Sequence, residues 1–145
     1  MRLAGVWLLG FALLATLGCL GGSLDLSGNE YALKEAQRRY TELVRWGEIE
    51  GASVYVDPAI TDAFLVTAER LQHVRFTDSE SGPLQFGEDS DTATVDVVYH
   101  AYSTRILVEQ KFREHQEWYR EASAGDTWRV RPNLAAIARE LSGSQ

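Results

Sequence analysis

The chain has 145 residues, a formal net charge of −7 at pH 7, a single cysteine and 45% apolar residues. This length and apolar content suit one domain with a real core. The acidic balance gives no electrostatic reason to bind nucleic acid or anionic lipid, and one cysteine excludes a disulfide within the chain.

Residues 1–18 predict a secretory signal peptide. Arg2 gives a positive start, a short apolar run follows, and small residues stand at its end. An uncleaved membrane anchor is the alternative. Five glycines up to residue 22 argue against it, because they weaken this segment as a permanent membrane helix. Removal of the segment leaves 127 residues with a net charge of −8.

The residues before Cys19 resemble the bacterial lipobox, in which Leu, a small residue and Gly or Ala precede the cysteine. Gly18 and Cys19 match this pattern, whereas Thr16 stands where Leu is usual and Leu17 follows one place late. The resemblance implies that Cys19 carries several acyl chains, enough for a stable membrane anchor. In proteobacteria, Leu20 in place of Asp after the cysteine indicates the outer membrane, with the domain in the periplasm. Ordinary cleavage after Gly18 is the alternative.

A tether and a long helix are expected next. Residues 19–29 contain the lipidated Cys and a flexible tether rich in Gly and Ser, and residues 30–145 form one domain. Ser27 and Glu30 form an S-x-x-E capping box. Apolar residues then recur at helical spacing to about Trp46.

Shorter helices are expected to follow. Gly47 ends the first helix, and residues 47–56 favour a short helix, although the run from Val54 to Val56 also suits a strand. Asp57 and Pro58 predict the cap and first residue of another helix, whose apolar face reaches Leu71.

The second half of the domain alternates as strands do. Extended segments are expected from Val74 to a turn at residues 79–83, briefly over 84–86, and at length over 92–102, 108–121 and 127–131. A short helix is expected from Asn133 to Leu141. On the first long strand, one face carries Ala93, Val95, Val97, Tyr99 and Ala101.

Helices followed by a curled antiparallel sheet form an α+β pattern. The order resembles the nuclear-transport-factor-two-like (SnoaL-like) cone, in which N-terminal helices pack in the hollow of a strongly bent antiparallel sheet. The segments that carry the resemblance are "YALKEAQRRYTELVRW", "TATVDVVYHAYS", "VEQKFREHQEWYRE" and "GDTWRV", within residues 30–132. It implies a hollow for small apolar ligands, an Asp–His pair in catalytic members, and dimerisation through the outer sheet face. A cystatin-like domain with one main helix is the alternative.

Asp96 and His100 are the first candidates for such a pair. Positions four apart on a strand lie roughly 13 Å apart along one face, too far for a direct hydrogen bond. Alternation places both on the outer face, opposite Val95, Val97 and Tyr99, which favours two solvated side chains.

Glu114 is the stronger candidate for acid–base chemistry. Alternation places Glu109, His115 and Glu117 on the polar face of the second long strand. Glu114 and Gln116 share a face with apolar residues, so burial there would shift the Glu114 carboxyl toward acid–base use.

No metal site or cofactor motif is expected. The acidic loop at Glu88, Asp89 and Asp91 fails the calcium-loop template. The three histidines lack metal-ligand spacing, and no hydrolase or phosphate-binding motif occurs. Large aromatics are mostly expected in the core, and those that could line a pocket are Trp46, Phe64, Tyr99, Phe112 and Trp118.

The leading hypothesis is therefore an envelope lipoprotein with a non-enzymatic binding or interaction domain. The alternative is an isomerase, dehydratase or hydrolase that acts on a small apolar compound in the hollow, with Glu114 as its acid. An acid that points into an enclosed cavity would favour the enzyme, whereas a hollow packed by Trp and Phe would exclude it. A homodimer through Val98 and Tyr102 on the outer face is a third possibility.

Overall fold

The computed structural model describes residues 23–143, and the predicted signal peptide and Cys19 lie outside this range. The helices are α1 (Ser23–Trp46), α2 (Ile49–Ala52), α3 (Thr61–Arg70) and α4 (Leu134–Gly143). The strands are β1 (Val74–Ser81), β2 (Gln85–Phe86), β3 (Thr92–Ser103), β4 (Ile106–Glu121) and β5 (Thr127–Arg131). Single 3₁₀ turns cover Ser53–Tyr55, Pro58–Ile60 and Ala122–Ala124.

Helix α1 starts earlier than the sequence pattern predicted. It begins at Ser23, so residues 23–29, which were expected in the flexible tether, are helical and Ser27 lies inside the helix. The S-x-x-E pattern misled because Ser and Glu three residues apart also fit a helix interior. The early turns are held to the sheet, since Arg120 of β4 donates to Asn29 Oδ1 at 3.2 Å. The predicted end at Trp46 is confirmed, with Gly47 at φ +75°.

The predicted cap at Asp57 is confirmed. Its carboxylate accepts from the Ala59 backbone N–H at 2.9 Å, and Pro58 occupies the first position of the following turn. Arg131 of β5 donates to the same carboxylate at 2.8 Å and lowers its pKa most, followed by the Ala59 bond. The helical segment is thereby joined to the last strand of the sheet.

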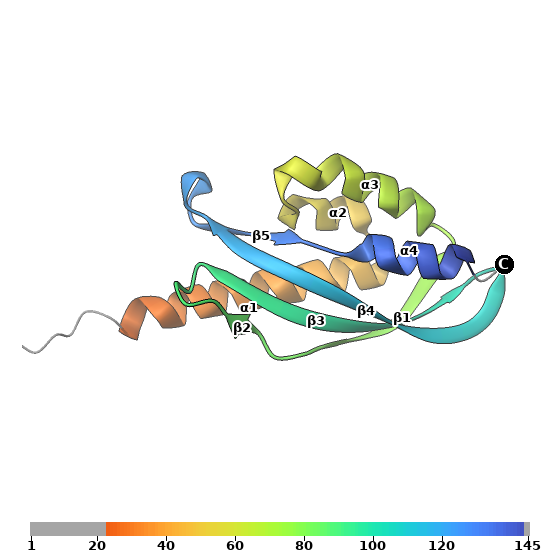
Figure 1. Ribbon diagram of the computed structural model, residues 1–145, viewed down its shortest axis with the longest axis horizontal. Helices are drawn as coiled ribbons and strands as arrows, with labels where there is room; N and C mark the ends of the chain where they lie inside the picture. The colour runs from red at the N-terminus through yellow and green to blue at the C-terminus, as the bar shows by residue number, and fades with distance from the viewer. Residues whose placement is uncertain (1–22, 144–145) are drawn as a thin grey trace, which may run out of the picture.

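The strands form one antiparallel sheet in the order β1–β3–β4–β5, with β2 also paired to β3. Figure 1 shows β3 and β4 as long, bent strands that run the length of the molecule. The inward set predicted for β3 is confirmed, because its side chains are all buried: Ala93, Val95, Val97, Tyr99 and Ala101. The brief strand at 84–86 is also present, and it pairs with β3.

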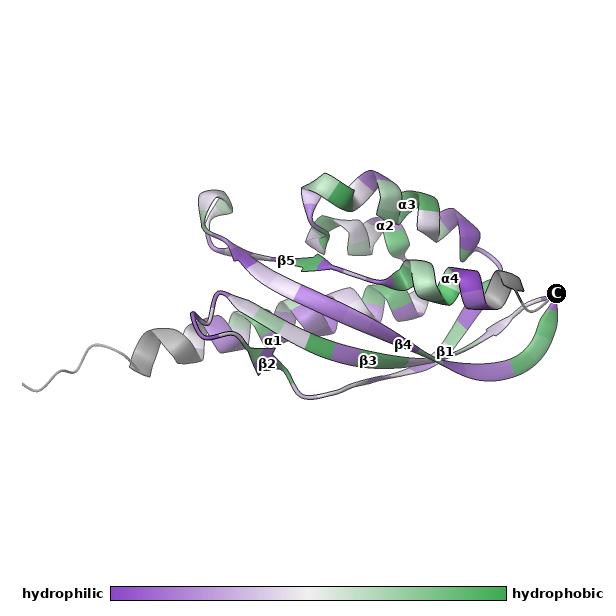
Figure 2. Ribbon diagram, in the orientation of Figure 1, coloured by the Kyte–Doolittle hydropathy of each residue, from purple (hydrophilic) through white to green (hydrophobic). Residues whose placement is uncertain are grey.

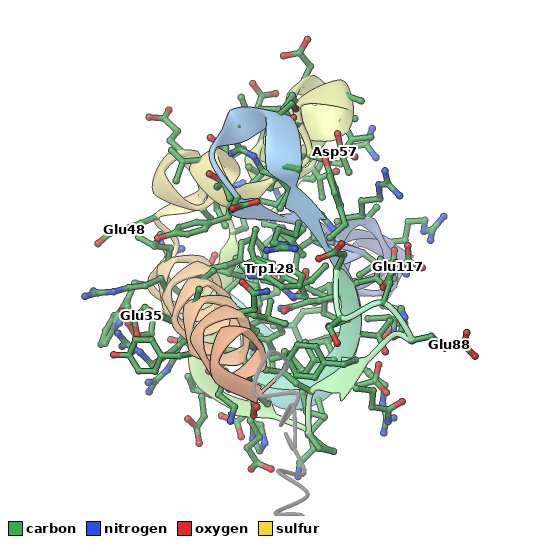
Figure 3. The ribbon with its side chains drawn as sticks, turned by 90° about the vertical axis from the view of Figure 1, so that its left-hand side faces the viewer. Glu35, Glu48, Asp57, Glu88, Glu117 and Trp128 are labelled. Carbon is green, nitrogen blue, oxygen red and sulfur yellow. The ribbon has the colours of Figure 1, made fainter. Side chains whose placement is uncertain are left out.

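The core lies between α1 and the sheet, with α3 and α4 covering its remaining side (Figure 1). Tyr40 of α1 contacts Trp118 of β4, with the ring planes nearly perpendicular and the centroids 6.0 Å apart. Phe64 of α3 packs on the other side of Tyr40, with its centroid at 6.3 Å. Figure 3 shows Trp128 of β5 among these inner side chains, and Figure 2 shows β4 as hydrophobic at its start and hydrophilic along most of its remaining length.

The predicted α+β class is confirmed. Helices α2 and α3 accompany the long α1, as the cone arrangement requires and the cystatin-like alternative does not. Among residues 23–143, none of the helices combines the length and the apolar character needed to cross a bilayer.

Candidate functional site

Glu114 lies on the inner face of β4, as alternation predicted. Its side chain is fully buried, between Phe112 and Gln116 on the same face. Glu109, His115 and Glu117 are exposed on the opposite face. A carboxyl group so far from water has to find its hydrogen-bond partners within the protein.

The two carboxylate oxygens of Glu114 are both occupied. Tyr40 donates its hydroxyl to Oε1 at 3.0 Å. Tyr99 donates to Oε2 at 3.1 Å, and the Gln116 amide donates to the same oxygen at 2.7 Å. We call Glu114, Tyr40, Tyr99 and Gln116 the buried cluster.

Burial raises the pKa of Glu114 to about 7. Desolvation is the largest cause, and the bonds from Gln116, Tyr40 and Tyr99 partly oppose it because they stabilise the charged form. The same burial, together with the nearby Glu114 carboxylate, holds the pKa values of Tyr40 and Tyr99 well above their usual range. Glu114 thus has the pKa of a general acid or base at neutral pH.

A polar path leads from the buried cluster toward the surface. The Gln116 amide also lies 3.4 Å from the Thr41 hydroxyl, which accepts from Gln37 at 3.0 Å. Gln37 in turn donates to Ser81, an exposed residue of β1, at 2.9 Å. Thr41 and Gln37 are themselves buried, so this path consists of hydrogen-bonded side chains.

Asp96 and His100 lie on the outer face of β3, and each binds other partners. Asp96 accepts from His115 at 2.8 Å and from Arg113 at 3.3 Å, and His115 is the largest cause of its lowered pKa. His100 lies 3.3 Å from a carboxylate oxygen of Glu109. Both pairs join β3 to β4 across the outer sheet face, where the side chain of His100 is 17% exposed.

The aromatics named as pocket lining occupy different environments. Tyr99, Phe112 and Trp118 are buried in the core, and Phe64 is 5% exposed. Trp46 is 71% exposed and lies outside the core. It follows the buried Val44 by two positions, which on a helix places it on nearly the opposite side.

A surface pocket of about 870 Å³ opens where α1 ends and α2, α3 and β1 meet. Its floor is apolar, formed by Ile49, Leu65, Leu71, Val74 and Phe76. We call it the α2–α3 pocket. Its volume is within the range of small-molecule sites. Phe76 lines this pocket and packs against Tyr99 of the buried cluster, with ring centroids 5.2 Å apart, so the two regions meet at this ring contact.

The rim of the α2–α3 pocket is acidic. Glu48, Glu50 and Glu69 line it together with one cation, Arg75. Within the described residues, none of these three carboxylates forms an ion pair or a side-chain hydrogen bond. Arg75 donates to the backbone oxygens of Gln72 and Val74 at 3.0 Å. The apolar floor is therefore bordered by three solvated carboxylates that have no ion-pair partner among the described residues.

Glu114 lines neither the α2–α3 pocket nor four further surface pockets formed by the described residues. Trp46 lines a neighbouring pocket with Tyr55 and Glu48, and Phe64 lines a groove between α3 and α4. Across residues 23–143, no group of three His, Cys, Asp or Glu side chains is placed to hold a metal ion.

The sequence pattern identified Glu114 but not its bond to Tyr40, and it did not indicate the α2–α3 pocket. Gln37 and Thr41 are polar residues four apart beside the buried helix stripe, and this pattern could have indicated a polar core. The α2–α3 pocket left no comparable pattern, because Glu48, Glu50 and Glu69 gather only when α2 and α3 fold against β1.

Comparison with known proteins supports the fold. A SEC-C motif-containing protein from Rhodopseudomonas palustris is 12% identical, over 68% of this chain and 74% of its own, with a TM-score of 0.54. A "putative polyketide cyclase" from Xanthomonas campestris pv. campestris is 11% identical, over 78% and 98%, with a TM-score of 0.51. No family model and no curated protein sequence matches. These likenesses support the predicted SnoaL-like cone, and at such identities they concern the fold alone.

Proposed function

We propose that this chain is a lipid-anchored protein of the cell envelope whose cone domain binds a ligand or partner without catalysing a reaction. The observation that carries the proposal is the filled hollow. Tyr40, Trp118 and Tyr99 occupy it, and Glu114 accepts hydrogen bonds on both oxygens.

Catalysis by Glu114 would require a substrate within hydrogen-bond reach of its carboxyl group. Tyr40, Tyr99 and Gln116 hold those positions, and the side chain has no exposed surface. A polar cluster that is fully satisfied in this way specifies and rigidifies a core. The proposal therefore assigns Glu114 a structural role.

The α2–α3 pocket is the proposed binding site. It is open to solvent, its floor is apolar, and its volume of about 870 Å³ suits a small molecule or a side chain of a partner. Helix α1 has 24 residues, so its first residue and this pocket lie about 36 Å apart along the helix axis. A lipid anchor on Cys19, four residues before Ser23, would thus leave the pocket away from the bilayer.

The anchor is tested by changing Cys19→Ala and following labelled palmitate and membrane fractionation. We expect the parent to incorporate label and to sediment with membranes, and the variant to do neither. Absence of label in the parent, with the same membrane partition in both proteins, would overturn the anchor.

The binding site is tested with a neutral probe, 4-phenylbutanol, by ¹⁵N–¹H NMR of the full chain. We expect shifts at the Gly47 and Gly51 amides, because both residues line the α2–α3 pocket. Gly125, in the turn before β5, is the control amide. Absence of any shift at the pocket amides would overturn the proposed site.

An enzyme is the second candidate, because Glu114 is a carboxyl group buried on the inner face of β4 and its pKa is raised to about 7. The similar Xanthomonas structure is named a "putative polyketide cyclase", which agrees with a catalytic use of the fold. The enzyme is tested by measuring whether a reagent can reach the Glu114 carboxyl. We expect a water-soluble carbodiimide with an amine to modify Glu117, which is exposed, and to leave Glu114 unmodified. Modification of Glu114 in the folded chain at the rate of Glu117 would favour the enzyme.

Association through Val98 and Tyr102 stays a prediction. Both lie on the outer face of β3, where Val98 is opposite Arg113 on one side and Glu80 on the other. Size-exclusion chromatography of the chain would test it, with a monomer at all concentrations as the contrary result.

A further inference from the structure

We infer that the α2–α3 pocket selects ligands that join a cationic group to an apolar body, such as an alkyl- or arylalkylamine. The inference rests on the proposed function, because it assigns the chemistry of that same binding site. It follows from the pairing of charges at the pocket rim and from the composition of the floor.

The carboxylates of the rim differ from most others on the surface. Glu35 pairs with Arg38 and Arg39 on α1. Asp91 pairs with Arg120, and Asp96 pairs with Arg113 and His115. Where the fold places an acidic side chain on a helix or strand face, it generally supplies a cation beside it.

At the α2–α3 pocket this pairing is missing. Glu48, Glu50 and Glu69 face one guanidinium, that of Arg75, which gives the rim a net charge of −2. Like charges gathered without counter-ions repel one another and are unfavourable in a chain that is already acidic. Departures from local rules of this kind are expected where a molecule binds.

The floor specifies the rest of the ligand. Leu71 and Val74 are buried, whereas Ile49, Leu65 and Phe76 are half-buried and contribute apolar surface to the pocket. A bare inorganic cation would gain nothing from this surface, because its hydration is lost without compensation there. A ligand with an apolar body buries that surface while its charged end remains near the carboxylates.

The test compares 4-phenylbutylamine with 4-phenylbutyrate, which have the same apolar body and opposite charge. Binding to the full chain is followed at the Gly47 and Gly51 amides at low salt and neutral pH. We expect the amine to bind about tenfold more tightly than the carboxylate, because several exposed charges each contribute modestly. Added salt should narrow this ratio.

The double variant Glu48→Gln, Glu69→Gln should reduce the amine-to-carboxylate ratio to about threefold or less. The matched control is Glu88→Gln with Glu117→Gln, which removes the same charge from exposed residues outside the pocket. Figure 3 shows Glu88 and Glu117 on the side of the molecule away from Glu48. The control should retain the parent ratio.

The outcomes separate the two levels of the proposal. If none of the three probes shifts the pocket amides, the binding site itself is wrong. If the alcohol binds and the amine and carboxylate bind equally, the site stands and the cationic selectivity is overturned. An equal loss of selectivity in both double variants would also overturn it, because net charge and not the rim would then be responsible.

Discussion

The buried cluster and the α2–α3 pocket place carboxylate groups in opposite environments. Glu114 has no exposed surface, and its carboxylate accepts hydrogen bonds from three donors. The carboxylates of Glu48, Glu50 and Glu69 are exposed and have no hydrogen-bond or ion-pair partner among the described residues. The two regions are neighbours, because Phe76 of the pocket packs against Tyr99 of the buried cluster. The chemistry open to a carboxylate is thus decided by what surrounds it.

This comparison makes a raised pKa insufficient evidence of catalysis. Glu114, whose pKa is raised to about 7, is a group that a ligand cannot reach, because burial causes both properties. The accessible groups lie on the surface that retains apolar area for a ligand. We therefore assign stability to the first region and recognition to the second.

The largest expected effect concerns the filling of the hollow. Trp118→Ala should lower the free energy of unfolding by about 3–5 kcal/mol, because it leaves a cavity beside Tyr40 and frees the Gln116 carbonyl that the indole N–H binds. Trp46→Ala, at an exposed tryptophan, should lower it by less than about 1 kcal/mol. Urea unfolding of both variants measures the difference, and equal losses would mean that the hollow is not filled.

The second effect is the pH dependence due to Glu114. Its pKa is raised from 4.5 to about 7 in the folded chain, so the folded state retains a proton that the unfolded state releases. The free energy of unfolding should therefore fall as pH rises from about 4.5 to about 7, by roughly 3 kcal/mol. Carboxylates with lowered pKa, such as Asp57 and Asp96, act in the opposite sense and below this window.

Glu114→Gln tests this assignment. The variant should lose the decline between pH 5 and pH 8, so that its stability relative to the parent improves as pH rises. Glu117→Gln, on the exposed face of the same strand, should retain the decline. The same decline in all three proteins would show that another group is responsible.

A smaller effect is expected from the tyrosine hydroxyls. Tyr40→Phe removes the donor to Glu114 Oε1 and should lower the free energy of unfolding by about 1–2 kcal/mol. The loss should be larger at pH 8 than at pH 5, because the bond to the charged carboxylate is the stronger one. Tyr99→Phe should cost less, since Gln116 still donates to Oε2. Equal losses at both pH values would contradict a charge-assisted bond.

Most of the fold could be predicted because its signals are local. Strict alternation over residues 92–102 gives the inner face of β3, and Asp57 with Pro58 gives the helix start. The start of α1 could not be predicted, because the pattern at Ser27 is equally compatible with a helix interior, and residues such as Asn29 find partners only in the folded chain.

The candidate site was accessible to sequence reasoning only in part. The inner position of Glu114 follows from alternation, but its enclosure depends on Tyr40, which lies 74 residues away in the sequence. The exposure of Trp46 could have been predicted, because it stands two positions after Val44 of the buried helix stripe. The acidic rim depends on how two short helices pack, and their packing leaves no periodic signal.

The smallest expected effect is on stability at the pocket rim. Glu48→Gln and Glu69→Gln remove charges that have no described partner, so the free energy of unfolding should change by no more than about 0.5 kcal/mol. Any change should be stabilising, because the chain is acidic and the variants reduce its self-repulsion. Glu35→Gln is the contrasting variant, since it breaks ion pairs with Arg38 and Arg39 and should be destabilising. Thermal unfolding at low salt distinguishes them, and a clear loss of stability in the rim variants would mean that these carboxylates serve the fold rather than a ligand.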